Sequence, residues 1–121
     1  MITYDFAFCT KYRYDVIKPE MVTTALQLID SVAGGYNATV VATPEVELDF
    51  VHVRVSCPEA TSPVELLGVF KGTLSIGLQG AYPEAKARYY GKMMFDRSFF
   101  RTTTAATEGE LVAWKNEHPK H

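Results

Sequence analysis

The stretch LDFVHVRV, residues 48–55, has the most regular alternation of apolar and polar side chains in the chain. Alternation with a period of two, together with β-branched residues, is typical of a β-strand. Because successive side chains of a strand point to opposite faces, we expect Phe50, His52 and Arg54 to share one face. That face would carry an aromatic ring, an imidazole and a guanidinium side by side.

The rest of the chain predicts a small α+β domain around this strand. Further strands are expected at residues 2–10, 36–43 and 99–104, and the strand that contains the opening stretch is expected to cover 46–57. Helices are expected at 19–33, from 62 to about 78, and from 107 to a stop at Pro119, while 80–95 has no regular pattern. Ser62 to Glu65 and Thr107 to Glu110 have the spacing of capping boxes.

The order β-α-β-β-α-β with one appended helix is that of the ferredoxin-like split β-α-β fold. We therefore expect an antiparallel sheet with two helices on one face, plus a C-terminal helix. The 121 residues fit one domain, residues 1–121, that is long enough to bury a core.

Composition narrows the class of protein further. Hydrophobic residues make up 47% of the chain, and no run approaches the roughly 20 apolar residues of a membrane helix. The N-terminus lacks the basic and then apolar order of a secretory signal, so we expect a cytoplasmic protein without membrane contact. Cys9 and Cys57 have no CxxC spacing and are expected to be buried, reduced thiols.

The formal net charge of −2 argues against strong nonspecific binding to nucleic acid. Positive side chains nevertheless gather in two parts of the sequence. The first group is Lys11, Arg13 and Lys18, and the second is Lys86, Arg88, Lys92, Arg97 and Arg101. Each group fits a solvated surface as well as it fits a binding groove.

The segment LVAWKNEH, residues 111–118, belongs to the predicted C-terminal helix. Trp114 and His118 lie four residues apart, so they share one helix face one turn apart.

Four segments in the same order resemble the small single-strand DNA transposases of the HUH superfamily, the insertion-sequence and REP-associated tyrosine transposases. CTKYRY at 9–14 resembles the family's TKYR segment, and DFVH at 49–52 stands where the family has Asp-His-Val-His. Residues 62–75, with Phe70-Lys71-Gly72, resemble its S-P…K-G-x-S helix. Residues 95–100, FDRSFF, resemble its W-x-R-x-Y-F segment before the last strand.

The resemblance implies a metal-and-tyrosine site from which groups are missing. In the family the His-x-His pair binds a divalent metal, a tyrosine on the last helix attacks the scissile phosphate, and a glutamine one turn later is a third ligand. Here those four positions hold Phe50, His52, Trp114 and His118. A phenyl ring cannot bind a metal and an indole cannot form a phosphodiester link, so no catalytic group is intact.

Two interpretations of the remaining histidines stay open. His52 and His118 are fewer than the three protein ligands usual in a catalytic site, although His121 could complete a weak magnesium or manganese site. Otherwise His52 is a residual polar residue, His118 a solvated one, and no cofactor is needed, which we favour. Strand alternation predicts that Glu47 and Asp49 face away from His52.

The leading interpretation is a transposase-like protein that binds single-stranded or hairpin DNA as a homodimer. Such a protein would be related to DNA transposition and recombination. It would have lost tyrosine strand transfer. The expected phosphate contacts are Lys11, Arg13, Lys71, Arg97 and Arg101. Tyr12 and Tyr14 would either stack on unpaired bases or pack as structural aromatics.

Two alternatives belong to other classes. One is a nonenzymatic regulator or protein-interaction module on the same fold. The other is an active metal-dependent nuclease or transposase whose nucleophile is atypical, although nothing in the sequence places another of the seven tyrosines at the site.

Overall fold

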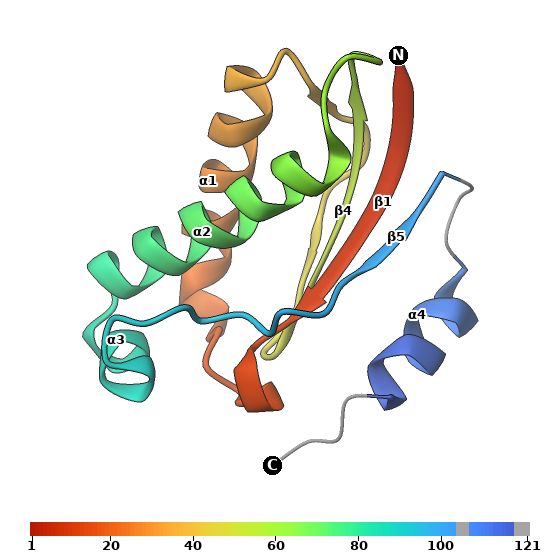
Figure 1. The fold of residues 1–121 in the computed structure, drawn as a ribbon. Helices are drawn as coiled ribbons and strands as arrows, with labels where there is room; N and C mark the ends of the chain where they lie inside the picture. Colours follow the sequence, from red (N-terminus) through yellow and green to blue (C-terminus); the bar gives the residue numbers. More distant parts are fainter. Residues whose placement is uncertain (104–106, 118–121) are drawn as a thin grey trace.

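The computed structural model describes residues 1–103 and 107–117. Figure 1 shows a central sheet with helices on both sides. The elements in chain order are β1 (Ile2–Cys9), η1 (Lys11–Arg13), η2 (Pro19–Met21), α1 (Val22–Gly35), β2 (Thr39–Val40), β3 (Glu45–Val46), β4 (Phe50–Cys57), α2 (Pro63–Ala81), α3 (Pro83–Tyr89), β5 (Phe100–Thr102) and α4 (Glu108–Asn116).

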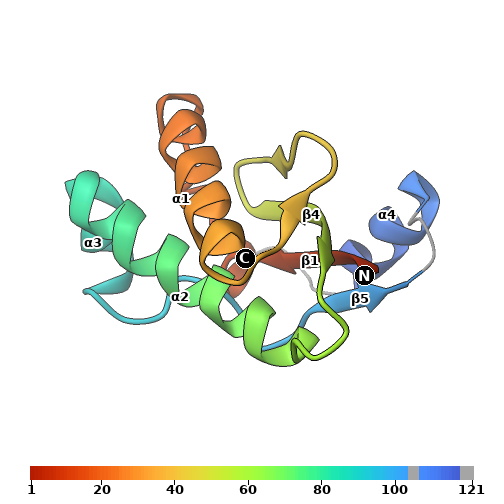
Figure 2. The ribbon, with the colours of Figure 1, turned by 90° about the horizontal axis from the view of Figure 1, so that it is seen from above.

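The sheet has the order β2-β4-β1-β5, and β3 also pairs with β4. Every pair is antiparallel, and β1 and β4 pair along their whole length, from Ile2 opposite Cys57 to Cys9 opposite Phe50. Helices α1 and α2 cover one face, whereas α4 lies on the other (Figures 1 and 2). The predicted ferredoxin-like α+β fold is therefore confirmed.

The main core lies between the sheet and helices α1 and α2. One side-chain row of β1 and one of β4 enter it, with Phe6, Phe8 and Val53 fully buried. Ile29 of α1 and Phe70 of α2 meet these rows from the helix layer. Each such side chain contributes about 1.5–3 kcal/mol through removal of apolar surface from water, so this layer fixes the sheet.

The two predicted helix starts are confirmed. At α2 the Ser62 hydroxyl accepts a hydrogen bond of 3.3 Å from the Glu65 N–H. At α4 the Thr107 hydroxyl accepts from the Glu110 N–H at 3.1 Å and donates to the Glu110 carboxylate at 3.2 Å. These caps satisfy N–H groups that a helix leaves unpaired at its first turn.

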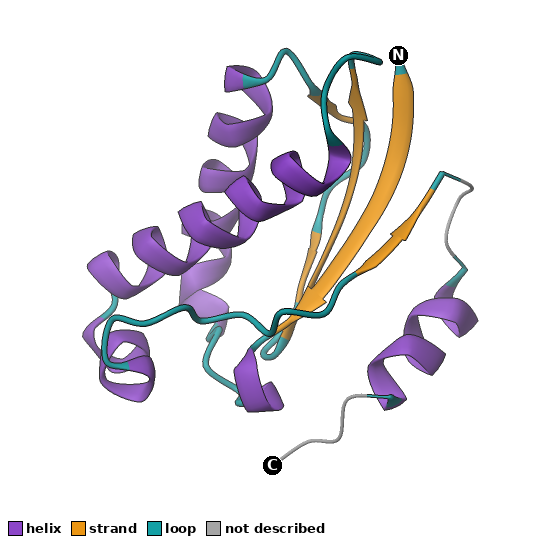
Figure 3. Cartoon of the chain, viewed as in Figure 1, coloured by secondary structure: helices purple, strands orange, loops and turns teal. Residues whose placement is uncertain are grey.

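The strand expected at 36–43 is reduced to β2, and two other segments differ in kind from the prediction. The single strand expected at 46–57 is a hairpin, in which β3 pairs with β4 and the chain turns at residues 47–49. The stretch expected to be irregular, 80–95, contains the seven-residue helix α3, as Figure 3 shows. Both elements are short, so neither spans enough residues to produce a clear periodicity.

Cys9 and Cys57 are free thiols, and both are completely buried, as predicted. They lie at opposite ends of the β1–β4 pairing. Burial, with a smaller effect of Asp96, raises the pKa of the Cys9 thiol to about 11. No helix in the described part of the chain has the length and apolarity needed to cross a membrane.

Candidate functional site

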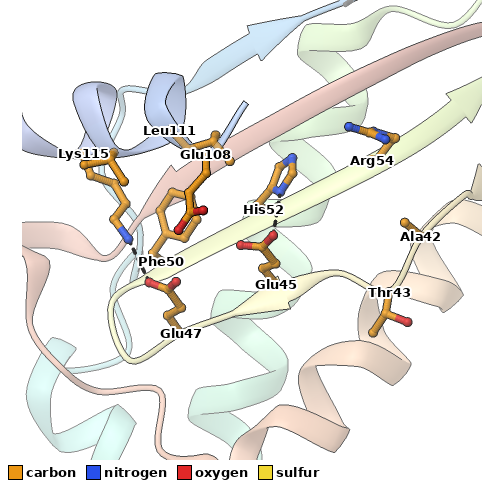
Figure 4. Close-up of a pocket in the computed structure, with 11 residues that line it drawn as sticks. Ala42, Thr43, Glu45, Glu47, Phe50, His52, Arg54, Glu108, Leu111 and Lys115 are labelled. Carbon is orange, nitrogen blue, oxygen red and sulfur yellow. Dashed lines mark hydrogen bonds and ion pairs between the residues drawn. The ribbon is translucent and has the colours of Figure 1, made fainter. Parts of the chain in front are cut away.

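A pocket of about 430 Å³ lies between the β3–β4 hairpin and helix α4, on the sheet face opposite the main core (Figure 4). Its lining combines carboxylates, cations and apolar side chains. The lining residues are Ala42, Thr43, Glu45, Glu47, Phe50, His52, Arg54, Glu108, Leu111, Val112 and Lys115.

Strand β4 forms the floor of this pocket. Phe50, His52 and Arg54 all line it, so the predicted shared face is confirmed. The alternate residues Val51, Val53 and Val55 enter the main core on the opposite side. The alternation of the opening stretch thus divides β4 into a packing face and a polar face.

Asp5 holds the polar side chains of the floor in place. This buried residue of β1 lies with Oδ1 2.7 Å from His52 Nε2, and Arg54 Nε donates to the same oxygen at 3.1 Å. A buried carboxylate is stable only when it is paired, and these two partners meet that need. Asp5 was not predicted as a site residue, although an acid between Tyr4 and Phe6 in an apolar strand is itself a signal of a buried partner.

The two positions that the family resemblance assigns to a metal ligand and to the nucleophile are in contact. The rings of Phe50 and Trp114 lie 6.2 Å apart between centroids, and Trp114 also lies 6.5 Å from Phe100. Phe50, Leu111 and Ala7 are the buried members of this second apolar cluster. Side chains that the resemblance predicted to be chemically disabled therefore hold α4 against the sheet.

Two polar contacts add to the attachment of α4. Lys115 Nζ lies 2.8 Å from Glu47 Oε2 and 4.4 Å from the centroid of Phe50. Arg13 donates from Nη1 to the Lys115 carbonyl at 3.2 Å, and its guanidinium pairs with Asp49 at 3.0 Å. The last helix is therefore connected to η1 and to the β3–β4 turn as well as to the sheet.

Acidic groups outnumber the permanent cations around the pocket. Arg54 and Lys115 supply two positive charges, and the carboxylates of Asp5, Glu45, Glu47 and Glu108 supply four negative ones. The prediction that Glu47 faces away from His52 is wrong, because the turn before β4 returns Glu47 to the pocket side. A phosphate in this pocket would meet net repulsion at short range.

The described side chains do not fit the divalent metal centre that the family resemblance implies. Phe50 offers no donor atom, and His52 Nε2 is engaged by Asp5, with Nδ1 3.8 Å from Glu45. Within residues 1–103 and 107–117, no three His, Cys, Asp or Glu side chains are arranged to hold an ion. His118 and His121 lie outside the described residues.

The six predicted DNA contacts differ in exposure, and none of them lines the pocket beside α4. Lys11, Tyr12, Arg97 and Arg101 are exposed. In the β1–β5 register Arg101 stands opposite Phe6, whereas its neighbours Phe100 and Thr102 stand opposite Ala7 and Asp5. Arg101 is therefore on the α1–α2 face of the sheet, away from the pocket.

Two of the six are engaged inside the protein. Lys71 is buried, its ammonium donates to the Arg97 carbonyl at 3.3 Å, and burial lowers its pKa. Arg13 is half-buried in its contacts with Asp49 and α4. As arranged here, Lys71 directs its charge to a backbone carbonyl and Arg13 pairs with Asp49, and the assignment of both residues to DNA stays a prediction.

The two tyrosines considered for base stacking divide between the two interpretations. Tyr14 is half-buried, with its ring 6.0 Å from that of Tyr89 and with Arg88 stacked 3.7 Å above it. Tyr12 is exposed and its ring lies 5.5 Å from that of Tyr14. Tyr14 is thus a packed aromatic, whereas Tyr12 presents its ring to solvent.

The family model "Transposase IS200 like" matches residues 1–113, and the chain belongs to this family. That match ends one residue before Trp114, so the assignment of Trp114 to the nucleophile position stays a prediction.

Individual relatives agree with this family. The chain is 24% identical over 121 residues to the ISDra2 transposase TnpA of Deinococcus radiodurans, covering 98% of this chain and 86% of the relative. The fold resembles a crystal structure of a Deinococcus radiodurans R1 chain described as a transposase, with a TM-score of 0.88 and 20% identity over 99% of this chain and 92% of the other. A REP-associated tyrosine transposase bound to a REP hairpin resembles it with a TM-score of 0.58 and 13% identity, over 97% and 62% of the two chains.

Proposed function

We propose that this protein binds hairpin or single-stranded DNA and does not carry out tyrosine strand transfer. The observation that carries the second part is the contact between Phe50 and Trp114, at 6.2 Å between ring centroids. Strand transfer needs a metal ligand and a nucleophile at these positions, and the two aromatic side chains there pack on each other instead.

The DNA part of the proposal is supported by membership of the IS200-like transposase family. A structural relative, the REP-associated tyrosine transposase, is described as bound to a REP hairpin. Without a bound metal, the acidic pocket beside α4 is a poor place for a phosphate, so the proposal places the main DNA contacts on other surfaces of the molecule.

Two assays on the full chain test the proposal. Fluorescence anisotropy would compare pools of hairpin DNA, duplex DNA and RNA at about 50 mM and about 200 mM salt, since phosphate contacts weaken with added salt. We expect a preference for the hairpins and weaker binding at the higher salt. Incubation with hairpin DNA and manganese, followed by denaturing electrophoresis, should give no covalent protein–DNA adduct.

Either assay can contradict the proposal. An adduct would assign the protein to the active enzymes with an atypical nucleophile. The absence of DNA binding even at low salt would favour the nonenzymatic interaction module.

The double variant Phe50→His/Trp114→Tyr provides a prediction about the ancestry of the site. It returns an imidazole to β4 and a phenol to α4 at two positions that are in contact here. We expect metal-dependent adduct formation to appear, with Phe50→His/Trp114→Phe as the matched control that lacks the nucleophilic oxygen. A folded double variant that forms no adduct would show that more than these two groups has been lost.

We also propose a homodimer. Strand β5 stands at one end of the sheet order and pairs over only three residues, so its outer edge is a surface on which a second copy could dock. Sedimentation velocity should give the mass of two chains at micromolar concentration, and the mass of one chain would contradict the proposal.

A further inference from the structure

Unusual backbone conformations gather at the end of the molecule that carries η1 and α3. In the described chain four residues other than glycine have positive φ: Tyr12 at 60°, Arg13 at 52°, Asn37 at 55° and Tyr90 at 54°. Asparagine tolerates this left-handed region, but for tyrosine and arginine it costs about 1 kcal/mol or more. Strained residues of this kind persist where the surrounding structure holds them, often at binding sites.

The two strained tyrosines lie on segments that are bonded to each other. The Tyr89 hydroxyl donates to the Lys11 carbonyl at 2.9 Å, so Tyr12 and Tyr90 each follow a residue of this hydrogen bond. Burial raises the pKa of Tyr89 to about 12, which keeps the phenol protonated and able to donate. The hydrogen bond from the Tyr89 hydroxyl to the Lys11 carbonyl therefore holds the end of α3 against η1.

The tyrosines of these two segments differ in how far they are buried. Tyr89 is buried and Tyr14 is half-buried, with Arg88 stacked on Tyr14 at 3.7 Å. By contrast, Tyr12 is 51% exposed and Tyr90 is 84% exposed. Both exposed tyrosines have positive φ, so the backbone is strained at each position where a ring is presented to water.

The two segments that carry the exposed rings, with their flanks, hold more exposed cations than acids. Lys11 lies 5.7 Å from the centroid of Tyr12. The exposed cations of the same two segments and their flanks are Lys11, Lys18, Lys86, Arg88 and Lys92, and the nearby acids are Asp15, Glu20 and Glu84. Here cations outnumber acids, the reverse of the balance at the α4 pocket.

We propose that Tyr12 and Tyr90 form a stacking platform for unpaired bases of a DNA hairpin, and that Lys11 and Arg88 hold the adjoining phosphates. The inference rests on the proposed DNA-binding function and adds the surface and the part of the DNA that it recognises. Exposed aromatic rings among cations are the combination that binds single-stranded nucleic acid, because every base has a π-face and every linkage a charge. Duplex DNA offers the charge but hides the base faces.

The positive φ angles allow a variant that separates binding from folding. Tyr90→Gly removes the ring and relieves the left-handed strain, so its melting temperature should equal or exceed that of the unaltered chain. Tyr12→Gly makes the same change on η1, and Tyr12→Phe and Tyr90→Phe keep a ring at each site. Val64→Ala, an exposed apolar residue at the start of α2, is the control for nonspecific surface loss.

Affinity would be measured by anisotropy on three fluorescent probes: a DNA hairpin with a single-stranded tail, a duplex of the same stem, and the RNA counterpart of the tailed hairpin. We expect each Gly variant to bind the tailed hairpin about tenfold more weakly, with a smaller change on the duplex. The Phe variants and Val64→Ala should bind within about twofold of the unaltered chain.

The outcomes separate this inference from the proposed function. Binding of the tailed hairpin that is unchanged in both Gly variants would overturn the platform and leave DNA binding intact. No binding of either DNA by the unaltered chain at about 50 mM salt would overturn both. Tighter binding of the RNA probe than of the DNA hairpin would overturn the assignment of DNA as the ligand.

Discussion

Asp5 is the residue on which the polar face of the sheet depends. Its carboxylate is the shared partner of His52 and Arg54, at 2.7 and 3.1 Å, and it is buried while Arg54 reaches toward solvent. Removal of the carboxylate would leave two buried or half-buried nitrogen groups without this acceptor. Hydrogen bonds to charged groups contribute about 1.5–3 kcal/mol each.

We therefore predict that Asp5→Ala lowers the free energy of unfolding by about 2–4 kcal/mol. The urea midpoint measured by circular dichroism checks this, with Glu59→Ala, an exposed loop carboxylate, as the control. The control should change stability by less than about 0.5 kcal/mol. Equal effects of the two substitutions would mean that the Asp5 network does not stabilise the fold.

Burial of the Cys9 thiol predicts how stability depends on alkaline pH. Its pKa is raised from 9.0 to about 11 in the folded protein, mainly by burial. Above about pH 9 the unfolded chain loses this proton while the folded chain retains it, so stability falls as pH rises toward 11. Two pKa units correspond to roughly 2–3 kcal/mol.

Urea midpoints between about pH 8 and about pH 11 check this prediction. The loss should be shallower in Cys9→Ala, which has no thiol to ionise. Other buried groups, including Tyr89, also lower stability as pH rises. The test is therefore the difference between the slope of stability against pH in the unaltered chain and the slope in Cys9→Ala. Parallel profiles would show that the Cys9 thiol does not contribute.

Single residues also show where sequence reasoning stops. Lys71 was assigned to DNA from its place in the resemblance, yet it lies on the buried stripe of α2 with Leu67, Leu74 and Leu78, at spacings of four, three and four residues. That periodicity indicates burial, because a lysine stem can pack while its ammonium finds a carbonyl. The partner, the Arg97 carbonyl, depends on a loop path that no pattern in the sequence specifies.

At the scale of elements, α4 is attached to the sheet through few contacts. Leu111 is its one buried residue. Trp114 contacts Phe50 and Phe100, and Lys115 pairs with Glu47 and accepts a hydrogen bond from Arg13 at its carbonyl. A nine-residue helix is too short to be stable without such packing. The docked position of α4 therefore depends on the second apolar cluster.

We predict that Leu111→Ala releases α4 and costs about 2–3 kcal/mol of docking energy. Trp114 is the only tryptophan in the chain, so its emission should shift to the red and become accessible to acrylamide, while the far-ultraviolet dichroism of the main domain is retained. Val112→Ala on the same helix, at a position 45% exposed, is the control. An unshifted emission in Leu111→Ala would show that the remaining contacts suffice.

Elements with strong local signals were predicted, and short ones were not. Helices α2 and α4 have capping residues whose hydrogen bonds are present in the structure. Strand β3 has two residues and follows Pro44, so its existence depends on pairing with β4 rather than on its own sequence. The missed turn is also the reason that Glu47 was placed on the wrong side.

At the scale of the whole molecule, charge separates two regions with different chemistry. The α4 pocket has more carboxylates than cations, whereas the surface of η1 and α3 has more cations than carboxylates. A net charge of −2 hides this division, which is why composition alone argued against nucleic acid. The local electrostatic field, rather than the net charge of the whole chain, governs the approach of a charged ligand.

The fully paired ladder of β1 and β4 has a practical consequence. Its two ends carry Cys9 and Cys57, which an alkylating reagent can reach only when the surrounding structure opens. The labelling rate of each cysteine would therefore report how often its own end of the β1–β4 pairing opens. Equal alkylation rates of Cys9 and Cys57 would mean that the sheet opens as a single unit. Unequal rates would show which end of the pairing opens more often.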